Sequence, residues 1–233
     1  MGVNSQQLSH NPVAISRTRA RTSRMWRMLM PACLAVVILS GTGTGQAIAA
    51  TPLSPTATVQ DAIQRVVSIL RNTEFDRDTR WLEIGRVIDA RFDFRSMSQS
   101  VLSANWRMAT VTEKAQFVEF FSQYLEVVYR TKIEAYSDQN VEFVGEDIRR
   151  DRASVDTFIV ANNIRVPVTY RLKNNDGEWF VYDVLIEGIS LVNNYRNTFS
   201  AIIQAEGMEG LLTDLEGRIS DYKAKHGGLL PPE

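Results

Sequence analysis

The sequence predicts an α+β domain in which N-terminal helices pack on a curved antiparallel sheet of about four strands and two helices close the chain. Apolar residues recur with a helical period of 3.6 up to about residue 136 and with a strand period of 2 from Asn140 onward. Helices therefore precede strands instead of alternating with them, which is typical of an antiparallel α+β arrangement. The run from Trp179 to Ile186 is apolar on both parities, as expected of a central strand covered on both sides.

The first 49 residues have the organisation of a secretory signal peptide. Five arginines between Arg17 and Arg27 precede an apolar run from Met28 to Leu39, no Asp or Glu is present, and the segment ends in small residues at Ala49. A membrane anchor is the alternative, but twelve helical residues rise only about 18 Å against roughly 30 Å of hydrocarbon. We therefore expect export and cleavage after Ala49, one domain over residues 50 to 225, and a loose tail from 226 to 233.

Four helices are expected before the sheet. The first is expected to be capped by Thr58, the second to follow Asp76 and the third to follow Asp93. The fourth is the longest and opens with a capping box in which Thr110 reaches Glu113. Apolar residues cover a wider part of this helix's circumference than packing against a single neighbouring element requires.

Strands are expected over residues 141 to 148, 153 to 161, 164 to 172 and 179 to 186. The turn residues from Asn174 to Gly177 make the last two strands a hairpin. Gly188 ends the fourth strand, a helix runs from about Leu191 to residue 205, Gly207 stops it, and a final helix follows.

Composition removes most catalytic chemistry. Beyond residue 49 the chain has no cysteine and a single histidine, His226, which excludes Ser-His, Cys-His and His- or Cys-ligated metal sites, so we expect no cofactor and no metal. With 21 Lys and Arg against 27 Asp and Glu, this part has a net charge of −6 and no basic cluster to suggest a nucleic acid partner. The enzymatic alternative is an isomerase or hydrolase that acts on an apolar substrate, with Asp183 or Glu187 as the base.

Aromatic and branched side chains are more abundant on the longest helix and the late strands than a simple domain needs. They either form a packed core or coat the walls of an apolar cavity between helices and sheet, and sequence alone leaves both interpretations open. In the second interpretation, Asn193, Asn194 and Arg196 are candidates for the polar mouth. The candidate lining residues are Phe117, Phe121, Tyr124, Val128, Val166, Val168, Tyr170, Tyr182, Val184, Ile186, Tyr195 and Phe199.

Three separated stretches resemble the MlaC family, whose members are also called toluene-tolerance proteins. The stretches are FDFRSMSQSVLSANWR at residues 92–107, FVEFFSQYLEVVYRTKIEAY at 117–136 and VYDVLIEGISLVNNYR at 181–196. The resemblance favours the cavity, with acyl chains inside it and the head group at its mouth.

By the same resemblance, the protein would be a non-catalytic periplasmic carrier that shuttles phospholipids between the outer and inner membranes. It would serve an ABC-type lipid transport (Mla) system that maintains outer-membrane lipid asymmetry. The implied partners are an inner-membrane ABC transporter complex, through its MCE-domain subunit, and an outer-membrane lipoprotein associated with a porin.

Overall fold

The computed structural model describes residues 53–134, 140–161 and 164–226. The expected signal peptide and most of the expected C-terminal tail lie outside these ranges. Within them, no helix combines the length and the apolar composition needed to cross a membrane.

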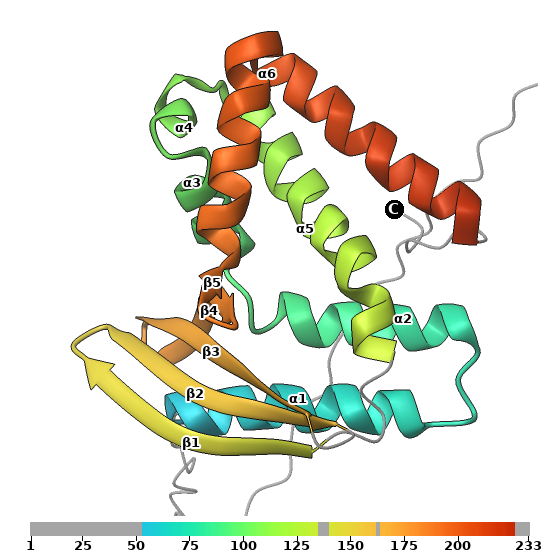
Figure 1. Ribbon diagram of the computed structural model, residues 1–233, viewed down its shortest axis with the longest axis vertical. Helices are drawn as coiled ribbons and strands as arrows, with labels where there is room; N and C mark the ends of the chain where they lie inside the picture. The colour runs from blue at the N-terminus through green and yellow to red at the C-terminus, as the bar shows by residue number, and fades with distance from the viewer. Residues whose placement is uncertain (1–52, 135–139, 162–163, 227–233) are drawn as a thin grey trace, which may run out of the picture. The chain divides into compact units, whose positions relative to one another are not determined.

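Five helices precede the sheet (Figure 1). They are α1 (Pro55–Arg71), α2 (Arg77–Asp89), α3 (Phe94–Leu102), the short α4 (Ala104–Met108) and α5 (Val111–Glu134). Four of them were predicted from the sequence. The fifth, α4, was not, because it is a little over one turn long and leaves too few residues for a periodic pattern.

Short polar side chains cap the N-termini of these helices, except that of α4. The predicted caps Asp76 and Asp93 accept hydrogen bonds from the backbone N–H groups of Thr79 and Ser96, each at 2.7 Å. The capping box at Thr110 is also present, since the Glu113 carboxylate accepts from the Thr110 N–H at 2.7 Å. The prediction for α1 was wrong by one turn.

Ser54, and not Thr58, caps α1. The Ser54 hydroxyl accepts from the Ala57 N–H at 3.1 Å, and Pro55 occupies the first turn, where its missing N–H costs nothing. Thr58 lies inside the helix and donates its hydroxyl to the Ser54 carbonyl at 2.9 Å.

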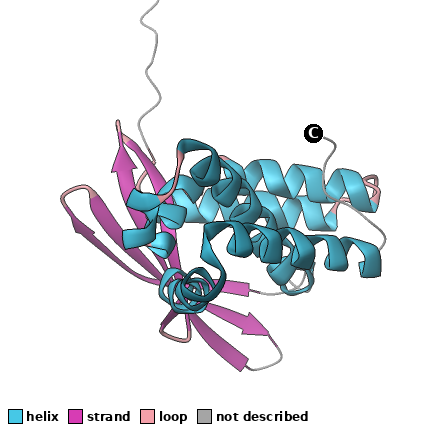
Figure 2. Ribbon diagram, turned by 90° about the horizontal axis from the view of Figure 1, so that it is seen from above, coloured by secondary structure: helices cyan, strands magenta, loops and turns pink. Residues whose placement is uncertain are grey.

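The strands form one antiparallel sheet in the order β1-β2-β3-β4-β5. They are β1 (Asn140–Arg149), β2 (Arg152–Ala161), β3 (Ile164–Asn175), β4 (Glu178–Ile186) and β5 (Ile189–Ser190), so the sheet has one more, very short, strand than predicted. Figure 2 shows the strands fanning out with the twist of a curved sheet. The β3–β4 hairpin turns at Asp176 and Gly177, which have positive φ angles of 52° and 95° and lie within the turn predicted over Asn174 to Gly177.

The last helical segment, α6 (Leu191–His226), is interrupted at Gly207. Gly207 has φ 75° and ψ −175°, which no helical residue adopts and which glycine tolerates best. The chain therefore ends in two helical stretches, as predicted, and they lie at an angle to each other in Figure 1.

Two packed clusters hold these elements in place. One joins α3, α5 and α6 around Phe117, Phe121 and Leu211, all with 0% of their surface exposed. The other joins α1 to the sheet around Val59, Val155 and Leu172.

Asp183 ties β4 to the beginning of α6. Its side chain is buried, with 3% exposed, and accepts hydrogen bonds from the Ser190 hydroxyl at 2.7 Å and the Val192 N–H at 3.2 Å. The Arg171 guanidinium lies 3.3 Å away on the neighbouring strand. This carboxylate therefore satisfies a helix N-terminus and an arginine at once.

We predict that Asp183→Ala lowers the free energy of unfolding by about 2–4 kcal/mol, because it leaves buried donors without an acceptor. Urea denaturation followed by circular dichroism measures this change. Asp221→Ala, at an exposed position of α6, is the control and should change stability by less than about 0.5 kcal/mol. Equal stability of the two variants would contradict the structural role of Asp183.

Candidate functional site

A cavity of about 850 Å³ lies between the helices and the sheet. Its walls come from α1, α2, α5 and strands β2 to β4, and most of the lining side chains are apolar. The volume is in the upper part of the range of small-molecule binding sites.

The wall from α1 follows from the helical period of its sequence. Lining positions recur at spacings of three and four residues, so they form one stripe along the helix. Val59, at the start of the stripe, is buried against the sheet with 3% exposed, whereas Ile63, Val66 and Val67 are only half-buried. The stripe meets the sheet at Val59, and farther along α1 its side chains remain partly exposed toward the cavity. Its lining members are Thr58, Val59, Ala62, Ile63, Val66 and Val67.

The sheet supplies the opposite wall through alternate residues of neighbouring strands. Val168 pairs with Ile186, and Tyr170 pairs with Val184, so these side chains share one face. Burial raises the pKa of Tyr170 to about 12, so its hydroxyl stays uncharged beside this wall. Five of the predicted lining residues lie in this wall: Val166, Val168, Tyr170, Val184 and Ile186.

The predicted aromatic residues of α5 and α6 lie elsewhere. Phe117, Phe121, Tyr195 and Phe199 belong to the packed cluster of α3, α5 and α6, where neighbouring ring centroids are 5.5 to 6.0 Å apart. Tyr124 packs against the side of the same cluster, 5.7 Å from the ring of Tyr195. These rings fill space with one another, as in an ordinary core.

Two further predicted lining residues also differ in position. Val128 is 36% exposed on α5 and does not line the cavity. Tyr182 lies under the guanidinium of Arg152, 4.7 Å from its ring centroid, and likewise does not line the cavity.

The residues predicted for the mouth have other surroundings. Asn193 and Asn194 are exposed on the first turn of α6 and do not line the cavity. Arg196 donates its Nε–H to the Ser100 carbonyl at 2.9 Å and so holds α6 against α3.

The cavity wall that comes from α1 and α2 was not predicted from the sequence. The α1 stripe was recognised as apolar, but the pattern of a stripe that faces a cavity is the same as that of a stripe that faces a core. The α2 wall is less regular because it includes polar groups. Its lining residues are Trp81, Leu82, Gly85, Arg86, Val87, Ile88 and Asp89.

A buried polar group connects α2 to α5 at the cavity wall. The Arg130 guanidinium, with its residue 2% exposed, lies 4.4 Å from the centroid of the Trp81 ring and 2.6 Å from Glu126. The Trp81 indole N–H donates to Glu134 at 2.9 Å. The pKa of Glu126 is raised, mainly because the side chain is buried. Arg130 lowers this pKa in part, and the negative charge of Asp89 raises it further.

The enzymatic alternative finds little support in this geometry. Asp183 does not line the cavity, and its oxygens are occupied by Ser190, Val192 and Arg171. Glu187 lines the cavity but is exposed on a turn. Among the residues that the structure describes, no group of three or more His, Cys, Asp or Glu side chains could hold a metal ion.

Comparison with known proteins gives consistent matches. The MlaC protein family model matches residues 60–217. The toluene tolerance protein ttg2D of Pseudomonas putida is 30% identical over 160 residues, which are 64% of this chain and 71% of that protein. The intermembrane phospholipid transport system binding protein MlaC of Haemophilus influenzae is 24% identical over 122 residues, which are 50% of this chain and 57% of that protein.

A solved structure has the same fold. It is the phospholipid-binding protein from Ralstonia solanacearum in complex with a phospholipid, which superimposes with a TM-score of 0.68 at 24% sequence identity. The match covers 73% of this chain and 99% of that one. The family model spans well over half of the sequence, and the Pseudomonas relative is aligned over more than two thirds of its length. The chain therefore belongs to the MlaC family.

Proposed function

We propose that this protein is a phospholipid-binding carrier of the periplasm that holds acyl chains in the cavity between α1, α2, α5 and the sheet. The observation that carries the proposal is the 850 Å³ of apolar-lined space whose wall residues, such as Ile63, Val166 and Ile186, are only half-buried. Two relatives, the Haemophilus and Ralstonia proteins, are named for phospholipid transport or binding and support the choice of ligand.

The energetics explain why such a lipid needs a carrier. A phospholipid has roughly 30 chain methylenes, and exposing them to water costs about 0.8 kcal/mol each, or more than about 20 kcal/mol in total. A free lipid would therefore cross an aqueous compartment very slowly. A protein that covers the chains and leaves the head group hydrated removes most of this barrier.

Family membership and the predicted export signal support a wider role. The carrier would shuttle phospholipids between the outer and inner membranes as the soluble component of an ABC-type Mla system, and so maintain outer-membrane lipid asymmetry. Its partners would be the inner-membrane complex with an MCE-domain subunit and the outer-membrane lipoprotein–porin complex. Catalysis has no part in this role.

Native mass spectrometry of the protein purified without added lipid tests the proposal. We expect a species heavier than the polypeptide by the mass of a phospholipid, and loss of that increment after extraction with organic solvent. A uniformly lipid-free protein that also fails to take up labelled phospholipid would contradict the proposed function.

A bulky substitution in the cavity wall distinguishes open space from a filled core. Val166→Trp should displace bound lipid and change the free energy of unfolding by less than about 1 kcal/mol, because the new ring enters existing space. The control is Val155→Trp on β2, where the residue is fully buried but does not line the cavity. There the ring overpacks the core, which should cost about 1–3 kcal/mol.

The amount of bound lipid measures the displacement, and urea denaturation measures the change in the free energy of unfolding. The same loss of stability in both variants, with lipid content unchanged in Val166→Trp, would show that the space is not a ligand site.

A further inference from the structure

Six side chains in the described cavity wall are polar without carrying a charge. A polar group that faces an apolar cavity loses its hydrogen bonds to water when an apolar ligand fills the space. It then needs a partner from the protein or from the ligand. The six are Thr58, Trp81, Ser122, Gln123, Tyr129 and Tyr170.

Four of the six donate hydrogen bonds to the protein. Thr58 donates to the N-cap residue of α1 and Trp81 to the last residue of α5, each at 2.9 Å. Ser122 and Gln123 both donate to Glu119, at 2.8 and 3.3 Å. These four groups therefore already have acceptors within the protein.

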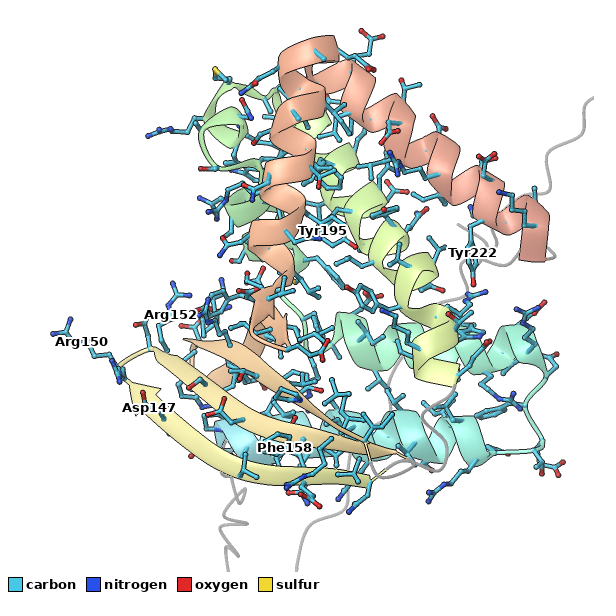
Figure 3. The ribbon with its side chains drawn as sticks, in the orientation of Figure 1. Asp147, Arg150, Arg152, Phe158, Tyr195 and Tyr222 are labelled. Atoms are coloured by element: carbon cyan, nitrogen blue, oxygen red, sulfur yellow. The ribbon has the colours of Figure 1, made fainter. Side chains whose placement is uncertain are left out.

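The hydroxyl of Tyr129 also has a partner. It interacts with Tyr195 through a side-chain hydrogen bond. Tyr195 projects from α6 toward α5 (Figure 3), so this bond joins the two helices.

Tyr170 differs from the other five. Its hydroxyl has no hydrogen-bond partner among the residues that the structure describes, and burial alone raises its pKa. The hydroxyl is nevertheless not one of the described side-chain atoms that are closed off from accessible space without a partner. It therefore reaches open space, where a ligand can supply the missing acceptor.

The sheet leaves the cavity as that space. β3 runs between β2 and β4, and Tyr170 pairs with Val155 on one side and Val184 on the other, 0% and 7% exposed. Its neighbours on the same face of β3, Val168 and Leu172, are also buried and apolar. The hydroxyl is thus a single donor in an apolar part of the wall.

We propose that the Tyr170 hydroxyl donates a hydrogen bond to an ester carbonyl of the bound phospholipid. The inference rests on the proposed function, because it requires acyl chains in the cavity. Each acyl chain ends in an ester whose carbonyl oxygen only accepts hydrogen bonds, which complements a phenol that donates one. The bond would hold the junction of chain and glycerol against β3 and would favour ester-linked chains over ether-linked chains, which lack the carbonyl.

Competition binding to the delipidated protein tests the assignment. Two phosphatidylethanolamines, one with ester-linked and one with ether-linked chains of the same length, each displace a fluorescent phospholipid. The wild type should bind the ester lipid about three- to tenfold more tightly, the effect of one hydrogen bond. Tyr170→Phe should lose this preference, because it keeps the ring and removes the donor.

Tyr182→Phe on β4 is the matched control, since Tyr182 does not line the cavity. It should keep the preference and change both affinities less than about twofold. Both variants should melt within about 2 °C of the wild type, because the aromatic rings remain in place.

Infrared spectroscopy of the complex with the ester lipid reports on the bond itself. The ester carbonyl stretch should lie at lower wavenumber in the wild type than in Tyr170→Phe, because a hydrogen bond weakens the carbonyl bond. The same frequency in both proteins would overturn the assignment.

Two binding results would also overturn it while leaving the carrier intact. One is a wild type that binds the ester and ether lipids equally, and the other is a Tyr170→Phe variant that keeps the wild-type preference. A wild type that binds neither lipid would instead contradict the proposed function itself.

Discussion

The apolar face of α1 and the inner face of β3 and β4 point toward each other across a space that neither fills. Two packed clusters keep them apart, one around the aromatic rings of α5 and α6 and one where Val59 meets the sheet. The cavity is open to solvent, so without a ligand it holds water against apolar walls, which is unfavourable. A guest with apolar groups would replace this water.

A ligand with acyl chains is suited to this cavity because its chains are apolar and gain free energy when they are buried. Burying about 30 methylenes is worth more than about 20 kcal/mol. The polar groups of the site lie in the wall and at the opening. Arg130, Trp81 and Glu126 connect α2 to α5, and the cluster around Val59 joins α1 to the sheet. Lys132 and Glu187 also line the cavity and are exposed to solvent.

Much of the fold could be predicted because its signals are local. Asp76, Asp93 and Thr110 begin helices through hydrogen bonds within three residues, and the Asp176-Gly177 turn fixes the β3–β4 hairpin by backbone conformation alone. Five of the six predicted site residues of the sheet lie on the cavity wall for a similar reason, since alternation along a strand decides which face a residue takes; Tyr182, which lies under Arg152, is the exception. Whether Val166, Tyr170 or Ile186 contacts lipid stays a prediction.

The helical part of the site could not be predicted because periodicity shows an apolar arc without showing what faces it. The arc of α5 is divided between two surroundings: Phe117 and Phe121 meet α6, whereas Leu125 and Tyr129 reach the cavity. Which part meets which depends on where α6 docks, and Arg196 and Asp183 determine that docking through contacts with residues on other elements.

Photo-crosslinking with a phospholipid that carries a diazirine in its acyl chain tests the central claim most directly. If the chains occupy this cavity, peptide mapping will find adducts on α1, α2 and the inner face of β3 and β4, at residues such as Ile63, Leu82 and Val166. Adducts confined to exposed residues of α6 or to the outer face of the sheet would contradict the claim, because they would show that the acyl chains bind outside the cavity.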